Sequence, residues 1–196
     1  MSGAVVLDRF TLAQIAGLAP LHAAAGGPIE VDVGAGKGRF LLARAKHHPS
    51  TSFLGIERQM GRVLRIARQS RRLGLANIRI VRLDALYVIE HLLPQASVAT
   101  FYLFFPDPWP KRRHHDRRLV CAQFLDAVWR ALRPGGCLHV ATDDGSYFGE
   151  IARCARGDAR FRAVAPFIPA PEEATDFELT FAALGRSAHR LSVAKA

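Results

Sequence analysis

Short apolar runs alternate along the chain with stretches in which apolar residues recur at helical spacing. The apolar runs, many of them β-branched, predict seven strands, at 29–33, 52–56, 78–83, 98–105, 138–141, 161–164 and 191–193. Helical spacing predicts helices at 39–46, 61–73, 88–93, 121–132 and 147–156. This alternation is typical of an α/β domain with a mostly parallel sheet, right-handed crossovers and helices on both faces.

The length of 196 residues suits a single domain, 1–196, in which three regions are distinguished. Residues 1–28 are expected to hold a short amphipathic helix and a connector rich in glycine and alanine. The core is expected at 29–144. The C-terminal region, 145–196, includes a proline-rich loop before the last strand.

Charge is the unusual feature of the composition. The chain carries 27 lysines and arginines against 17 acids, a formal charge of +10, which favours an anionic partner such as nucleic acid. Part of this charge lies off the apolar stripe of the helix expected at 61–73, at Arg62, Arg65, Arg68 and Arg72. These arginines are expected to form a solvated face or to add to the positive field.

Three cysteines, Cys121, Cys137 and Cys154, are too far apart for a zinc knuckle. They are expected to be buried thiols in a reducing compartment. No apolar run reaches the length needed to span a bilayer. From the sequence we therefore expect a cytoplasmic protein with neither a bound metal nor a membrane partner.

Three prolines, at 106, 108 and 110, follow the apolar run 98–105 and prevent both further ladder pairing and a helix. They fix Asp107 at the end of a strand, beside Trp109, and a run of basic residues comes next. An acid held there beside a basic surface suggests a catalytic pocket that receives a polyanion. The alternative is an ordinary turn aspartate followed by a solvated charge run.

An acid also lies at or beside the end of each of the first five predicted strands: Asp32, Glu57, Asp84, Asp107 and Asp143. Ligands of open α/β sheets bind at the carboxyl ends of strands, so these acids are candidate ligand contacts. The glycines at 34, 36 and 38 allow backbone to approach a ligand, but their spacing fits neither the dinucleotide fingerprint nor a P-loop. A cationic nucleoside cofactor without a pyrophosphate fits this combination, with Glu57 binding the ribose hydroxyls.

Two sets of segments carry a specific resemblance. Residues 31–38, 55–57 and 83–85 resemble the S-adenosylmethionine site of class I methyltransferases, which have a Rossmann-like fold with a seven-stranded sheet. The Phe105–His115 run, together with 141–143 and 175–178, resembles the motifs of bacterial tRNA (guanine-N7)-methyltransferases. This resemblance implies transfer of a methyl group from S-adenosylmethionine to N7 of a guanine in the variable loop of tRNA, by a monomer or homodimer.

The resemblance also implies a role for individual residues, with the cofactor on the core region and the substrate on the C-terminal side. The catalytic residue would be Asp107. The cofactor contacts would be Asp32, Gly34, Gly36, Gly38, Glu57, Asp84 and Ala85. The substrate contacts would be Lys111, Arg113, His114, His115, Arg117, Arg118, Asp143, Thr175, Asp176, Phe177 and Glu178.

The chain departs from the family pattern near its C-terminus. Thr180-Phe181 and His189-Arg190 stand where the family has an arginine–glycine pair and a tryptophan–aspartate pair. Two other functions therefore stay open: methylation of another RNA or nucleobase, and RNA binding without catalysis. The presence of Asp107 and of the cofactor acids argues against the second. Trp109 is expected either to stack on a base of the substrate or cofactor, or to pack the loop onto the core.

Overall fold

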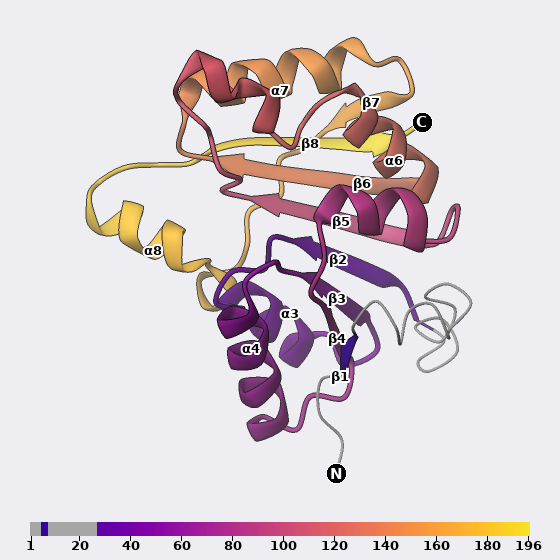
Figure 1. Ribbon diagram of the computed structural model, residues 1–196, viewed down its shortest axis with the longest axis vertical. Helices are drawn as coiled ribbons and strands as arrows, with labels where there is room; N and C mark the ends of the chain where they lie inside the picture. Colours follow the sequence, from indigo (N-terminus) through magenta and orange to yellow (C-terminus); the bar gives the residue numbers. More distant parts are fainter. Residues whose placement is uncertain (1–4, 8–26) are drawn as a thin grey trace.

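The computed structural model describes residues 5–7 and 27–196. The helix expected within residues 1–28 lies outside the described residues. The described part forms an eight-stranded sheet in the order β1-β4-β3-β2-β5-β6-β8-β7 (Figure 1). All seven predicted strands are present, so the predicted α/β fold with a mostly parallel sheet is confirmed. The strands are β1 Val5–Leu7, β2 Ile29–Val33, β3 Ser52–Ile56, β4 Ile78–Val81, β5 Val98–Phe104, β6 Leu132–Thr142, β7 Phe161–Val164 and β8 His189–Lys195.

Strand β8 is the antiparallel member of the sheet, and it pairs with β6 on one side and β7 on the other. The sequence did not predict β1, a three-residue strand that pairs with β4 at the edge. Strand β6 also begins earlier than predicted, at Leu132 instead of residue 138. The reason is local: Gly135 adopts a φ of +72°, and a register shift between Val98 and Thr100 lets the chain pair with β5 before the bend.

Helices cover both faces of the sheet, as predicted. One face packs against α3 Arg39–His47 and α4 Met60–Arg72. The other packs against α5 Ala85–Tyr87, the π-helix η1 Val88–Leu92, α6 Ala122–Ala131 and α7 Gly145–Gly157. The remaining helices, η2 Arg112–Arg117, η3 Pro171–Glu173 and α8 Asp176–Ala183, lie in the connections after β5 and β7.

Alternation along β5 shows how one strand serves both faces. Phe101 and Leu103 join the core under α6 and α7, whereas Tyr102 and Phe104 point to the opposite face. There the ring of Phe40, from α3, lies edge-on to both, with centroids 4.8 and 4.9 Å away. Both layers therefore fix the direction and the end point of β5, the strand that leads into the proline-rich turn.

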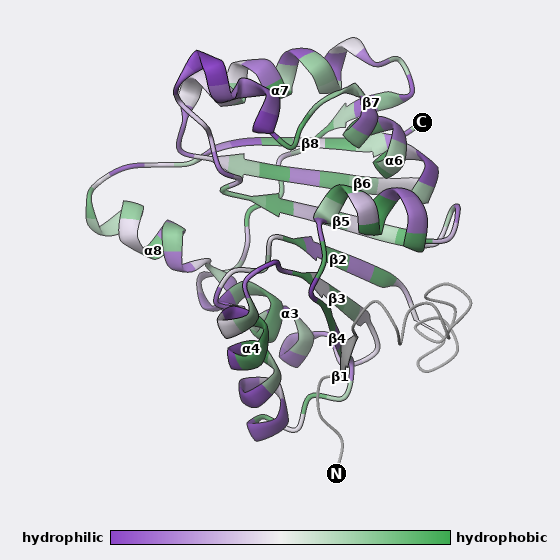
Figure 2. Cartoon of the chain, in the orientation of Figure 1, coloured by the Kyte–Doolittle hydropathy of each residue, from purple (hydrophilic) through white to green (hydrophobic). Residues whose placement is uncertain are grey.

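Helix α8 was not predicted, because the segment before β8 was expected to be a loop. It stands away from the sheet, beyond the carboxyl ends of β5 and β6, and most of its surface is apolar (Figures 1 and 2). Its N-terminus carries a capping box: the hydroxyl of Thr175 accepts from the Glu178 amide at 3.1 Å, and the Glu178 carboxylate accepts from the Thr175 amide at 2.6 Å. This Thr-x-x-Glu spacing is the sequence signal that identifies the helix.

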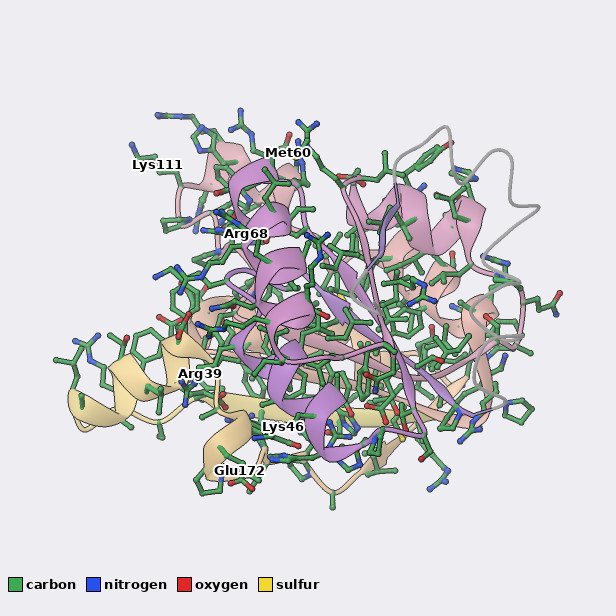
Figure 3. All side chains as sticks on the ribbon, turned by 90° about the horizontal axis from the view of Figure 1, so that it is seen from below. Arg39, Lys46, Met60, Arg68, Lys111 and Glu172 are labelled. Atoms are coloured by element: carbon green, nitrogen blue, oxygen red, sulfur yellow. The ribbon has the colours of Figure 1, made fainter. Side chains whose placement is uncertain are left out.

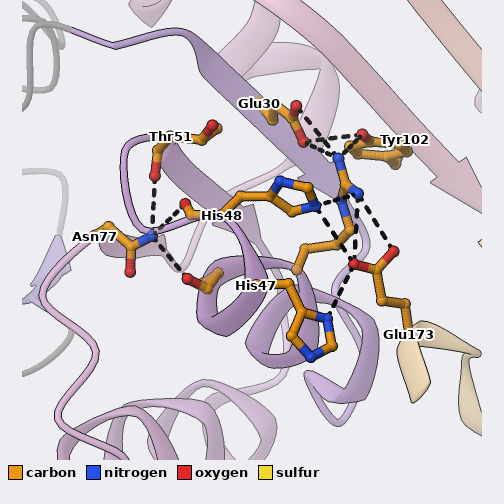
Figure 4. Close-up of polar contacts among 9 residues, drawn as sticks. Glu30, His47, His48, Thr51, Asn77, Tyr102 and Glu173 are labelled. Carbon is orange, nitrogen blue, oxygen red and sulfur yellow. Dashed lines mark hydrogen bonds and ion pairs between the residues drawn. The ribbon is translucent and has the colours of Figure 1, made fainter. Parts of the chain in front are cut away.

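A group of charged side chains holds the segment before α8 on α3 (Figure 4). The guanidinium of Arg44 donates to Glu30 at 3.1 Å and to Glu173 at 3.3 Å, and all three side chains are largely buried. The imidazoles of His47 and His48 lie 3.4 and 3.6 Å from the same Glu173 carboxylate. We call the Arg44–Glu173 pair and its neighbours the α3 clasp; it sets the position from which α8 starts.

Removing one partner of a buried ion pair leaves the other charge uncompensated, so Glu173→Ala should lower the free energy of unfolding by about 3 kcal/mol. Its neighbour Glu172 is exposed at the surface of the molecule (Figure 3), so Glu172→Ala is the matched control and should change the free energy of unfolding by less than about 0.5 kcal/mol. Denaturant unfolding measures both variants. Equal stabilities of the two variants would show that the clasp does not hold this segment.

Candidate active site

The carboxyl ends of the parallel strands meet at one edge of the sheet, and all five acids predicted at strand ends lie there. The pairing registers place Val33 beside Ile56, Ile56 beside Val81, and Phe104 beside Ala141. The acids follow or end these strands. They are Asp32 in β2, Glu57 after β3, Asp84 before α5, Asp107 after β5 and Asp143 after β6.

The loop after β2 leaves room for a ligand against its backbone. Gly34, Gly36 and Gly38 all have positive φ, of +78°, +58° and +82°. At Gly38 a Cβ would lie 2.5 Å from Ile66 Cγ1, so this glycine is required by packing against α4. At Gly34 no atom lies within 4 Å of such a Cβ, and at Gly36 the nearest is a backbone oxygen at 3.9 Å. The loop is therefore closed on its α4 side and open on the other.

Glu57 ties this loop to the start of α4. One carboxylate oxygen accepts from the Gly36 amide at 2.9 Å and the other from the Gln59 amide at 2.8 Å. The Arg62 guanidinium lies 3.6 Å away, and the glutamate itself is buried. Each oxygen has a second lone pair, so the carboxylate can still accept a hydroxyl from a ligand.

Asp32 lies beside Glu57 and is buried. Burial, together with the negative charge of Glu57, raises the pKa of Asp32 to about 7. Two neighbouring carboxyl groups of this kind favour a cation in the space that they face. Asp84 is more exposed; it caps α5 by accepting from the Tyr87 amide at 3.2 Å, directly before Ala85.

The turn that carries Asp107 is strained at two positions. Phe105 and Trp109, neither of them glycine, have φ of +53° and +44°, and the exposed Asp107 lies between them. The Phe105 amide donates to the Ala141 carbonyl at 2.7 Å, which continues the β5–β6 ladder to the start of the turn. A backbone in these conformations persists only where the surrounding structure holds it.

Arg118, which is predicted to contact RNA, provides that support in the structure. Its side chain is buried: Nε donates to the Pro108 carbonyl at 2.8 Å and the guanidinium forms an ion pair with Glu150 of α7. The guanidinium also lies over the Tyr147 ring, 4.8 Å from its centroid. We call Arg118, Glu150 and Tyr147 the Arg118 brace. The sequence gives no signal for Glu150, because its role depends on the docking of α7.

The other basic residues of the segment 111–117 follow Asp107 closely in the chain, and most of them lie at the surface. Lys111, Arg113 and Arg117 are exposed, whereas His114 and His115 are partly buried. Trp109 packs within the segment. The Arg117 guanidinium lies 5.0 Å from its ring centroid and the His114 ring meets it edge-on at 5.9 Å.

Helix α8 packs against Phe105, the residue at the start of the turn that carries Asp107. The rings of Phe177 and Phe181 lie 5.5 and 5.7 Å from the ring of Phe105, and Phe177 is 56% exposed. Glu178 forms an ion pair with Arg190 of β8, one of the residues that depart from the family pattern. Thr175 and Glu178 are therefore engaged in holding α8, while Asp176, Phe177 and, across the edge, Asp143 are exposed.

The cysteine expectation is wrong in one respect, because Cys121 and Cys154 are exposed and Cys137 is partly exposed. Among residues 27–196 and the short strand β1, no cluster of three or more histidine, cysteine or acidic side chains could hold a metal ion. Within the same described residues, no helix has both the length and the apolar character needed to cross a membrane.

The raised pKa of Asp32 predicts a pH dependence of stability. The unfolded chain ionises this carboxyl near pH 3.8 and the folded chain near 7, so stability falls as pH rises between these values and then levels off. Asp32→Asn cannot ionise and so avoids this loss in the free energy of unfolding, which is about 4 kcal/mol at most. Denaturant unfolding should therefore show little difference from wild type at pH 4 and a more stable variant at pH 8. The exposed control Asp143→Asn should differ from wild type in stability by the same amount at both pH values. The same result for Asp32→Asn would contradict a buried, protonated Asp32.

Comparisons with known proteins agree with this geometry. The model of a family described as putative methyltransferase matches residues 26–191. A tRNA (guanine-N(7)-)-methyltransferase of Leifsonia xyli subsp. xyli is 42% identical over 165 residues, which cover 82% of this chain and 73% of that relative. One of Chromohalobacter salexigens is 39% identical over 150 residues, which cover 74% of this chain and 61% of the relative's own length.

A solved structure shows the same fold at low sequence identity. The aminoglycoside resistance methyltransferase NpmB1 superposes with a TM-score of 0.62 at 18% identity, over 100% of both chains. The fold is thus that of class I methyltransferases, and the sequence relatives narrow the assignment. The resemblance in the sequence is confirmed: the chain belongs to the tRNA (guanine-N(7)-)-methyltransferase family.

Proposed function

We propose that this protein transfers a methyl group from S-adenosylmethionine to N7 of a guanine in tRNA, in the variable loop if it follows the family. The observation that carries the proposal is the position of Asp107. It is an exposed carboxylate on a strained and braced turn, at the same sheet edge as the open glycine loop. Family membership supplies the reaction and the class of substrate.

The residues at the ends of β2, β3 and β4 fit the cofactor. Gly34 and Gly36 leave space where a side chain would otherwise stand, so a ligand can approach their backbone. The second lone pairs of Glu57 can accept the ribose hydroxyls, and Asp84 with Ala85 lies next along the edge. Asp32 faces the same region and, when ionised, favours a positively charged ligand.

When bound, S-adenosylmethionine would supply an electrophilic methyl group to the lone pair of guanine N7, with the electrons of the broken carbon–sulfur bond remaining on sulfur. The purine gains the positive charge, and no proton leaves. Asp107 therefore acts as a fixed negative charge beside a developing cation and not as a general base. At ~4 Å and an effective dielectric near 20, this interaction is worth about 4 kcal/mol at most, or roughly a thousandfold in rate.

Substrate contacts are proposed on both sides of Asp107. Lys111, Arg113 and Arg117 are exposed and available for phosphate contacts, and His114 and His115 lie between them in sequence. The other proposed contacts are Asp143, after β6, and Thr175, Asp176, Phe177 and Glu178, at the start of α8. Arg118, also predicted to contact RNA, is buried and braces the turn, so its contribution to RNA binding would be through the position of the other residues. The cytoplasmic location and the choice between monomer and homodimer stay predictions.

The direct test is transfer of labelled methyl groups from S-adenosylmethionine to tRNA that lacks base methylation, followed by nuclease digestion and identification of the modified nucleoside. N7-methylguanosine is the expected product. A different methylated nucleoside would favour the alternative RNA or nucleobase substrate, and tRNA binding without transfer would favour a silent relative.

Asp107→Asn keeps the shape and an acceptor but loses the charge, so the single-turnover rate should fall by most of the ~10³ estimated above. The proposed role needs only the negative charge of Asp107, because no proton leaves the purine in this step. The matched control is Asp116→Asn, an exposed aspartate in the same segment, which should leave the rate within about twofold. The role given to Asp107 fails if its variant stays within about fivefold of wild type.

A further inference from the structure

Outside the active site, the most one-sided charge lies on and around α4. Between Glu57 and Asp84 the chain carries eight arginines and no acid: Arg58, Arg62, Arg65, Arg68, Arg71, Arg72, Arg79 and Arg82. All five arginines within α4 are exposed. We call Arg65, Arg68, Arg71 and Arg72 the α4 arginine face.

These four guanidiniums have little to bind within the protein. The nearby acids form ion pairs with other arginines: Glu57 lies 3.6 Å from Arg62, and Asp84 lies 3.9 Å from Arg58. Arg68 Nε donates to the Leu64 carbonyl at 3.3 Å, within its own helix. The guanidiniums of Arg65, Arg71 and Arg72 form no hydrogen bond or ion pair with any described residue.

The fold does not need this charge. Val63, Ile66 and Ala67 are the apolar residues that α4 buries against the sheet, and they lie on the other side of the helix. Like charges three or four residues apart destabilise an isolated helix by about 0.2–0.5 kcal/mol per pair, and here no acid on the helix offsets them. An anionic partner would relieve this repulsion, and the arginine guanidinium binds phosphate through two parallel hydrogen bonds.

The position of α4 connects this face with the active site. The helix begins at Met60, three residues after Glu57, at the edge where the cofactor and Asp107 are placed, and its 13 residues extend about 20 Å away from there. Along it, Gly61, Arg65, Arg68, Gln69 and Arg72 line a shallow groove of about 480 Å³ that is open to solvent. Figure 3 shows Arg68 beside this helix, with Met60 near the start of the helix.

We infer that the α4 arginine face binds the phosphate backbone of the substrate tRNA, at a distance from the guanine held beside Asp107. The inference rests on the proposed function and adds a second point of attachment to the basic segment 111–117. Two such points let the enzyme recognise the shape of a folded tRNA, because a short RNA that fills the active site cannot reach both. The face contacts no reacting atom, so it acts on substrate affinity and not on the chemical step.

The test replaces Arg65, Arg68 and Arg72 together by glutamine. The matched control replaces Arg153, Arg156 and Arg162 by glutamine. These three are also exposed, but they lie on α7 and β7, at the end of the sheet opposite β1 and β4. Both triple variants lower the formal charge of +10 by three, so any effect of net charge alone is the same in the two.

For the α4 variant, the log–log salt dependence of tRNA binding should flatten by about 2–3, at roughly 0.7–0.9 for each lost phosphate contact. Its KM for full-length tRNA should rise at least tenfold, while kcat and the affinity for S-adenosylmethionine stay within twofold. Methyl transfer to a short stem-loop that contains the target guanine should be unchanged. The control variant should match wild type in all of these.

Equal salt slopes and KM values for the two triple variants would overturn the inference. So would loss of binding to phosphatidylserine vesicles by the α4 variant with tRNA binding intact, since that result would assign the face to a membrane surface. The proposed function is tested separately by wild type. If wild type binds tRNA without methylating it, and the α4 variant binds more weakly, the proposed function fails and the inference stands.

Discussion

The Arg118 brace is the interaction on which the geometry of the proposed active site depends. A carboxylate can stabilise a developing cation only if it is fixed before the reaction, and Asp107 lies on an exposed turn without regular secondary structure. Hydrogen bonding of Arg118 to the Pro108 carbonyl, and its ion pair with Glu150, join this turn to α7. The two residues with positive φ on either side of Asp107 are tolerated because the turn is held from both ends.

Much of the fold follows from local sequence patterns. Helices cover both faces of the core strands, so these strands are apolar along their whole length. The continuous apolar runs of β3 and β5 therefore predict buried strands clearly. The acids at strand ends were predicted for the same reason, because a parallel sheet brings the carboxyl ends of its strands to one edge. Glycines 34, 36 and 38 also follow from the sequence, although only the structure shows that Gly38 is required by Ile66.

Long-range contacts could not be predicted in this way. Arg118 is one of several basic residues in a run, and nothing local distinguishes it from Arg117; its burial depends on Tyr147 and Glu150, about thirty residues away in sequence. The clasp between Arg44 and Glu173 spans more than a hundred residues. Helix α8 is an intermediate case. Its capping box is visible in the sequence, although the segment around it is predicted to be a loop.

The most direct test of this account is a double-mutant cycle on the brace, with single-turnover methyl transfer to saturating tRNA as the readout. Arg118→Met and Glu150→Gln should each lower the rate, the first by at least tenfold. The double variant should lose no more than Arg118→Met alone, because both remove the same support. Affinity for S-adenosylmethionine should stay within twofold of wild type, which shows that the cofactor side remains folded. A rate for Arg118→Met within twofold of wild type would contradict the claim that the brace holds Asp107 in place for the reaction.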